Sequence, residues 1–205
     1  MAGARRRYRY VGPVDVRAAV ADSAQGWPIR SQADLDSYLA AVDARDRDEP
    51  LTYVIDCDGT LRLAPRRSEH VACAGGGEVL GAGEIDFAAD RDDWVVTEVS
   101  NLSTGYCPGL TSWAAVADGL DRAGIAHPDG FTAAVVFRRC LDCGQRNVVR
   151  DDDYTCALCG AELPEDVEPR LTAQPSTDQS SPVTSARQGP SARTSPARTS
   201  AGPPG

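Results

Sequence analysis

The sequence predicts an α+β fold, in which an antiparallel sheet with covering helices is followed by a small cysteine-bearing module and a disordered tail. Three observations lead to this prediction. Short β-prone runs separated by Gly and Asp turns alternate with helical segments over residues 1–130, four cysteines pair up within residues 131–165, and Ser, Thr, Pro and Arg dominate residues 166–205. A chain of 205 residues has room for one ordinary globular domain and one small addition.

A short strand and two helices are predicted ahead of the sheet. Residues 8–11 have the composition of a strand, and residues 14–21 have helical character. The helix at 31–44 is better defined, because Ser31 can cap its N-terminus and apolar residues recur at helical spacing behind it. We expect both helices to cover the same face of the sheet.

The motif-bearing core of the domain is predicted at residues 51–124. Residues 51–64 predict two strands around a turn at Asp58-Gly59, because glycine supplies the positive φ that a tight hairpin needs. Gly124 favours the end of a helix, since glycine adopts the left-handed conformation at low cost. The remaining predicted elements are strands at 78–88 and 94–101, a helix at 111–123 and a strand at 131–139.

Four cysteines form the strongest chemical motif. One Cys-x-x-Cys pair consists of Cys140 and Cys143, a second consists of Cys156 and Cys159, and glycine follows each pair. The two-residue spacing lets both thiolates of a tight turn face one metal ion, and four thiolates complete a tetrahedral Zn²⁺ shell. We therefore predict a zinc ribbon over residues 131–165 that holds one structural Zn²⁺, with an Fe–S or rubredoxin-like iron site as the alternative. The two glycines are expected to turn the chain and donate N–H groups to sulfur.

The charge of the chain disfavours nucleic acid as a partner. All 21 basic residues are arginine, against 30 acidic residues, and the net charge is −9. Residues 10–170 hold 14 Arg and 29 Asp and Glu, a net charge of −15 that repels phosphate backbones. The apolar runs fall short of the roughly 18 residues that cross a bilayer, and the N-terminus does not complete a secretory signal. We expect a cytoplasmic protein without a membrane span.

A second motif extends from Tyr53 to Gly124. Its segments are Tyr-Val-Ile-Asp-Cys-Asp-Gly-Thr-Leu at 53–61, Ser-Glu-His at 68–70, Ala-Gly-Gly at 74–76, Ala-Gly-Glu at 82–84 and Ser-Thr-Gly-Tyr-Cys-Pro at 103–108. Their order resembles the HSSFLAGG, AGE and SGHYxP module of bacterial toxin-like proteins and of plant IQ-motif calmodulin-binding proteins. The resemblance implies a compact domain with a polar cleft lined by His70, Glu84, Ser103 and Tyr106. The second histidine of the family pattern is absent, because Thr104-Gly105 stands where that pattern has Gly-His.

Several residues of this segment allow two interpretations. His70 is either a working side chain or a hydrogen-bonded structural histidine. Cys107 stands in a loop before a helix, a setting that can create a nucleophilic thiolate, and an inert buried thiol is the alternative. A glycine run at 75–77 favours a plain turn, with an anion-binding loop as the alternative. A second metal site would need the four ligands His70, Cys73, Cys107 and His127.

Two classes of function follow from these motifs. The first is a zinc-binding adaptor or regulatory protein that recognises a protein partner or a small ligand through its acidic domain. The second is a transferase or hydrolase, an ADP-ribosyltransferase-like effector with a His70-centred cleft that also uses Glu84, Ser103, Tyr106 and Cys107. We favour the adaptor, because closed zinc sites organise surfaces and no nucleophile and base are linked by local spacing. A shared concave pocket for His70, Glu84, Ser103 and Tyr106 would favour catalysis, and scattered positions would favour the adaptor.

Overall fold

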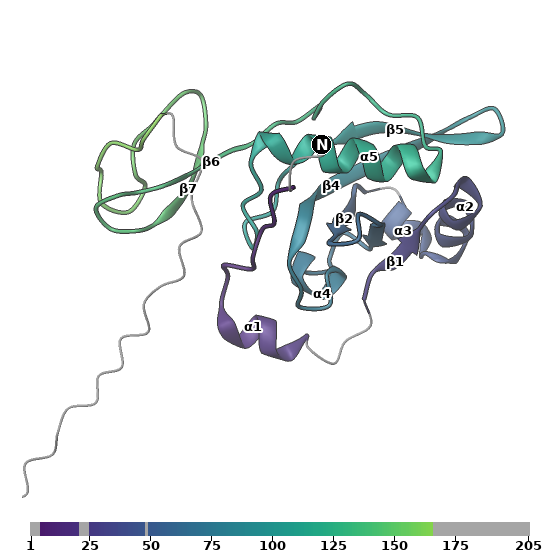
Figure 1. Ribbon diagram of the computed structural model, residues 1–205, viewed down its shortest axis with the longest axis horizontal. Coiled ribbons are helices and arrows are strands. Elements are labelled where there is room, and N and C mark those ends of the chain that lie inside the picture. The colour runs from purple at the N-terminus through teal and green to yellow at the C-terminus, as the bar shows by residue number, and fades with distance from the viewer. Residues whose placement is uncertain (1–4, 21–24, 48, 166–205) are drawn as a thin grey trace, which may run out of the picture. The chain divides into compact units, whose positions relative to one another are not determined.

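A five-stranded antiparallel sheet forms the centre of the fold, with strand order β1-β3-β2-β4-β5 (Figure 1). The computed structural model describes residues 5–20, 25–47 and 49–165, and the disordered tail predicted at 166–205 lies outside these residues. The strands are β1 (Trp27–Ile29), β2 (Leu51–Asp56), β3 (Leu61–Ala64), β4 (Val79–Asp90) and β5 (Asp93–Val99). The predicted antiparallel sheet with covering helices is confirmed. We call the described residues up to 130 the sheet domain and residues 131–165 the ribbon.

The helices of the sheet domain are short. They are α1 (Val14–Ala19), α2 (Gln32–Ala41), α3 (Ala44–Arg47), α4 (His70–Cys73) and α5 (Trp113–Ala123), and a 3₁₀ turn (Leu110–Ser112) precedes α5. Ser31 caps α2 as predicted, because its hydroxyl accepts a hydrogen bond from the backbone N–H of Asp34. Gly124 ends α5 with a left-handed φ of 69°. Among the described residues, no helix is both long and apolar enough to cross a bilayer.

The helices cover both faces of the sheet. Tyr53 of β2 belongs to one apolar core together with residues of α2 and α5, and the next residue, Val54, belongs to a second core together with residues of α4. Successive strand residues point to opposite faces, so these two cores lie on opposite sides of the sheet. The prediction that α1 and α2 share a face is wrong, because Val16 of α1 packs against the second core. Since β2 is apolar on both faces, both faces need a cover.

Two predicted strands are shorter in the structure. Within 8–11, only Tyr8 pairs, through an antiparallel bridge to Val79. Within 131–139, only the second half is a strand, because the backbone of Val135 is held by the side chain of Asn101 instead of by a neighbouring strand. The strand β1 and the helix α4 were not predicted from the sequence.

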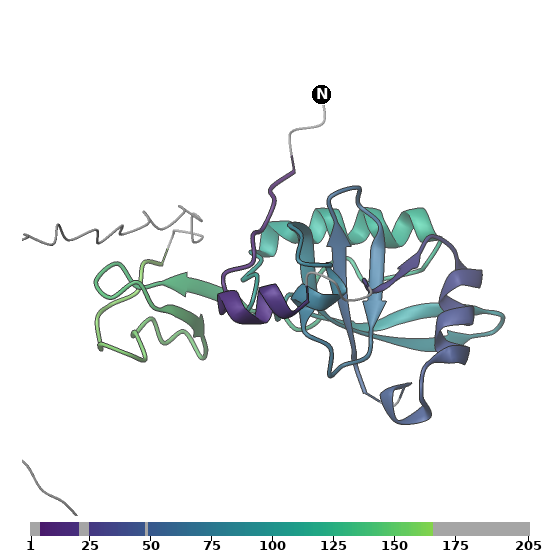
Figure 2. The same ribbon diagram turned by 90° about the horizontal axis from the view of Figure 1, so that it is seen from below.

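The ribbon is built on a two-stranded hairpin. Its strands, β6 (Val136–Arg139) and β7 (Arg146–Val149), pair antiparallel, with Phe137 opposite Val148 (Figure 2). The first cysteine loop connects β6 to β7, and the second follows a turn at 150–153 after β7; the two loops carry the four predicted metal ligands. The small core of the ribbon contains Cys140, Cys156 and Leu163.

Candidate metal centre and the predicted site residues

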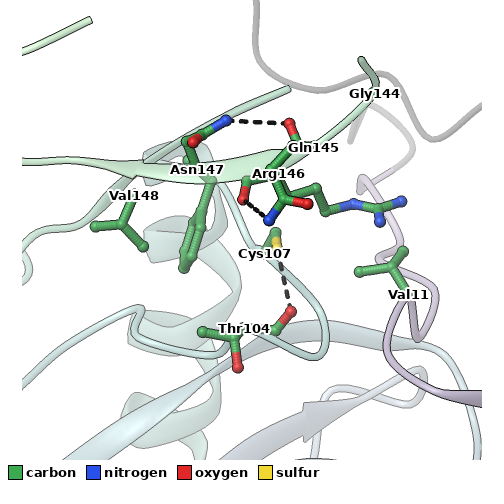
Figure 3. A pocket seen from close by; sticks show the side chains of 9 residues that line it. Val11, Thr104, Cys107, Gly144, Gln145, Arg146, Asn147 and Val148 are labelled. Atoms are coloured by element: carbon green, nitrogen blue, oxygen red, sulfur yellow. Dashed lines mark hydrogen bonds between the residues drawn. The ribbon is translucent and has the colours of Figure 1, made fainter. Parts of the chain in front are cut away.

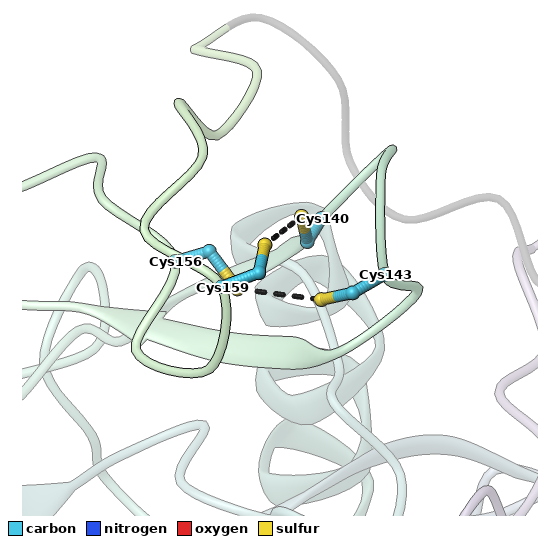
Figure 4. A group of neighbouring side chains, drawn as sticks. All are labelled: Cys140, Cys143, Cys156 and Cys159. Atoms are coloured by element: carbon cyan, nitrogen blue, oxygen red, sulfur yellow. Dashed lines mark hydrogen bonds between the residues drawn. The ribbon is translucent and has the colours of Figure 1, made fainter.

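The four cysteine sulfurs of the ribbon converge on one point (Figure 4). All four Sγ atoms lie within 4.8 Å of one another. The Sγ atoms of Cys140 and Cys159 are 3.5 Å apart, and those of Cys143 and Cys156 are 3.6 Å apart. A tetrahedral ion with Zn–S bonds of about 2.3 Å places its sulfurs about 3.8 Å apart, so the arrangement fits zinc. The sulfurs are too far apart for disulfides, which need about 2.05 Å.

Glycine shapes both cysteine loops. Gly144 and Gly160 have left-handed φ values of 76° and 74°, which turn the chain back as predicted. Their N–H groups donate to the backbone oxygens of Cys140 and Cys156, at 3.1 and 2.9 Å, so the prediction that they donate to sulfur is wrong. Each glycine lies four residues after its cysteine, where its N–H closes the turn onto a carbonyl. Other backbone N–H groups, that of Cys159 foremost, lower the pKa of Cys156, whereas the crowding of the thiols raises the pKa values of Cys143 and Cys159.

Asn147 joins β7 to the second cysteine loop and was missed by the sequence analysis. Its side-chain Nδ2 donates to the sulfur of Cys156 at 3.6 Å and to the oxygen of Gln145 at 3.1 Å. Its Oδ1 accepts the N–H of Ala157 at 3.0 Å. Groups that hold ligands in this way fix their orientation toward the metal. The sequence gives one signal of this role: asparagine is rarer in strands than elsewhere in proteins, yet Asn147 lies inside β7.

Among the described residues, the four-cysteine cluster is the one group of His, Cys, Asp or Glu side chains whose ligand atoms converge. The alternative second metal site, which needs His70, Cys73, Cys107 and His127, is therefore not formed. Its members have other partners: the thiol of Cys73 is within 3.6 Å of the oxygen of Arg62, and that of Cys107 is 3.3 Å from the oxygen of Thr104.

The glycine run at 75–77 is a plain turn. The N–H groups of Gly75, Gly76 and Gly77 donate to the backbone oxygens of Ala72, Val71 and Ala74, at 2.9, 2.8 and 3.2 Å. All three donors are thus used to close the turn after α4. The alternative of an anion-binding loop fails, because such a loop needs its N–H groups free to face the anion.

The structure brings two predicted site residues, His70 and Glu84, close together. His70 begins α4, and its Nε2 is 3.0 Å from the oxygen of Gly83 in β4. Burial lowers the pKa of His70, while the Gly83 hydrogen bond and the neighbouring carboxylate of Glu84 oppose that change. With a neutral ring, Nε2–H donates to Gly83, so His70 has the partner that the structural interpretation requires.

Ser103, Tyr106 and Cys107 form a separate group in the loop after β5. The backbone oxygen of Ser103 accepts the N–H groups of Tyr106 and Cys107, at 3.3 and 2.7 Å. The ring of Tyr106 is fully buried, and its hydroxyl donates to the oxygen of Gly77 at 2.7 Å. Burial raises the pKa of Cys107 to about 11, so this residue is a neutral thiol near pH 7 and not a thiolate nucleophile.

The five predicted cleft residues do not meet in one cavity. Cys107 lines a cleft of about 320 Å³, and Glu84 lines a different one of about 70 Å³. Neither cleft is lined by His70, Ser103 or Tyr106, so in the part of the chain that the structure describes the shared pocket that would favour catalysis is not found.

No family model, curated protein or solved structure matches this chain. The resemblance of residues 53–124 to the toxin-like module gains no support from these comparisons and stays a prediction.

Proposed function

We propose that this chain is a zinc-binding adaptor whose ribbon, organised by one structural Zn²⁺, docks a protein partner. The observation that carries the proposal is the convergence of four cysteine sulfurs within 4.8 Å. Four thiolates leave no coordination position for water or substrate, so an ion held there stabilises the ribbon instead of reacting. The sulfur spacing fits a tetrahedral four-sulfur shell, which zinc and iron both adopt, so metal analysis decides which ion is bound.

Two exposed leucines support a docking role for the ribbon. Leu141 is 79% exposed and lies in the first cysteine loop, and Leu158 is 68% exposed and lies in the second. A single exposed leucine is ordinary on a protein surface. One leucine in each metal-held loop is more informative, because anchor residues on rigid loops lose little conformational entropy when they bind. The acidic charge of residues 10–170 makes a protein a better partner than nucleic acid.

Metal analysis and a paired leucine variant test this proposal. We expect about one zinc per chain in the purified protein. The double variant Leu141→Ser, Leu158→Ser should keep its zinc and weaken capture of the partner from native lysate at least about tenfold, since both anchors are lost. Val14→Ser is the matched control, because Val14 is 82% exposed but lies on α1 in the sheet domain.

Three results would contradict the proposal. Iron or no metal in the purified protein would remove its basis. Equal capture of the same partner by the wild type and the double variant would exclude the leucine loops as the docking surface, and equal loss in Val14→Ser would show a general effect of surface hydrophobicity.

A further inference from the structure

A cleft of about 320 Å³ is lined by the loop at 104–107 and by β7 (Figure 3). Its apolar walls come from Val11, Phe137 and Val148, and its polar side includes Thr104, Cys107 and Arg146. The volume lies at the lower end of the roughly 300–1,000 Å³ that is usual for small-molecule sites. Polar groups make up the larger share of the lining, and the three apolar side chains provide the hydrocarbon surface that such sites also need.

Arg146 brings a positive charge to this cleft that the described residues leave uncompensated. Its Nε atom is buried and has no hydrogen-bond partner, and in the described part of the chain no carboxylate forms an ion pair with its guanidinium. Figure 3 shows the guanidinium extending past Cys107 toward Val11. A partly buried cation without a counter-charge is costly, so an anion in the cleft would compensate it.

Cys107 does not supply that anion. Its thiol donates to the oxygen of Thr104 at 3.3 Å. Burial keeps the thiol protonated near pH 7, although the positive charge of Arg146 acts in the opposite direction. The described residues therefore offer the cleft one cation, neutral polar groups and apolar walls.

We propose that this cleft binds a small organic carboxylate, with the carboxylate group on the guanidinium of Arg146 and the apolar body between Val11, Phe137 and Val148. A guanidinium fits a carboxylate through two parallel hydrogen bonds. A phosphate group carries more charge and more acceptor oxygens than one arginine satisfies, and it would gain nothing from the apolar walls. The charge and the walls together select an organic acid with a hydrocarbon body.

Amide NMR spectra of the zinc-loaded full chain test this proposal. The probes are phenylacetate, hexanoate and benzoate, with phenylacetamide as the uncharged match and inorganic phosphate as the second anion. The carboxylates should shift the resonances of 104–107 and 144–148, whereas phenylacetamide and phosphate should not. Arg146→Gln should weaken carboxylate binding at least about tenfold, because a charged hydrogen-bond partner is lost. Arg150→Gln removes the same charge from an exposed position just after β7 and should leave the affinity unchanged.

A second variant covers the case in which Arg146→Gln fails to fold. Thr104 is exposed at the rim of the cleft, so Thr104→Phe should obstruct it without removing a buried hydrogen bond, and carboxylate binding should be lost. The proposal is overturned if none of the carboxylates shifts these resonances, if phenylacetamide or phosphate shifts them as strongly, or if the affinity survives in a folded Arg146→Gln or in Thr104→Phe.

Discussion

At the scale of single residues, His70 shows how burial sets a protonation state and how that state contributes to stability. Its Nε2 lies 3.0 Å from the oxygen of Gly83, and burial lowers its pKa below the ordinary value of 6.5. The unfolded chain therefore binds a proton more readily than the folded one. The resulting stabilisation is present above the unfolded pKa and is lost as the pH falls through the folded pKa.

The first prediction is that His70→Gln flattens the pH dependence of stability. The glutamine amide can still donate to Gly83 but cannot be protonated in this range. Between about pH 7 and about pH 5, the free energy of unfolding should fall more steeply for the wild type than for the variant. Urea unfolding at each pH measures the difference. His127→Gln is the control, because the His127 Nε2 lies 3.3 Å from the exposed carboxylate of Asp121 and not against a β4 carbonyl. If the free energy of unfolding changes equally with pH in the wild type and in His70→Gln, burial does not lower the pKa of His70.

At the scale of elements, a close approach joins β4 to the end of β5. Gly83 lies so near the backbone of Ser100 that an added methyl group would overlap the Ser100 carbonyl oxygen. Tyr53 from the neighbouring strand also donates its hydroxyl to this oxygen at 2.8 Å. The absence of a side chain at position 83 thus lets three elements meet.

The second prediction is that Gly83→Ala destabilises the sheet domain by about 3 kcal/mol, because the backbone must move to admit the methyl group. This value is at the upper end of the usual cost of adding a methyl group to a packed core. Gly130→Ala is the matched control, since an added Cβ there meets nothing within 4 Å, and it should change stability by less than about 0.5 kcal/mol. Urea unfolding followed by tryptophan fluorescence gives both values. Similar stabilities for the two variants would mean that the strands can separate at Gly83 without cost.

The elements that the sequence analysis predicted are those specified by local chemistry. The β2–β3 turn depends on Gly59, whose φ is 77°, and on Asp56, whose Oδ1 accepts the N–H groups of Asp58 and Thr60. The strand β1 was missed because it contains Pro28, which local propensity excludes from strands, and because its pairing with β3 is a tertiary contact. Local propensity cannot specify a partner strand that lies more than thirty residues away.

The same distinction applies to the candidate sites. The cysteine cluster was predictable because each Cys-x-x-Cys pair sets its own geometry within one turn. Asn147 was not, because its bond to the Cys156 sulfur crosses from β7 to the second loop. The cleft at Arg146 was not predictable either, because its walls come from segments as distant as Val11 and Val148.

At the scale of the whole molecule, the sheet domain and the ribbon have separate apolar cores. The buried residues of the two sheet cores all come from Tyr8 to Ile125, and those of the ribbon core are Cys140, Cys156 and Leu163. A module of this size with so small a core needs another source of stability, and metal coordination is the usual one. The sheet domain, with larger cores on both faces, has no such need.

The third prediction is that the ribbon unfolds without metal while the sheet domain stays folded. After zinc removal by a chelator, or in Cys140→Ser, amides of 136–163 should lose their protection from hydrogen exchange, because metal-binding energy is folding energy in such a module. Amides of β2 and β4 should keep theirs. Hydrogen exchange of the full chain, read by mass spectrometry, resolves the two regions. Cys57→Ser is the control, since the thiol of Cys57 bonds the oxygen of Glu78 outside the metal centre, and it should leave the ribbon protected. Loss of protection in β2 and β4 together with the ribbon would show that the sheet depends on the metal-held module, and a ribbon that stays protected without zinc would show that its small core folds unaided.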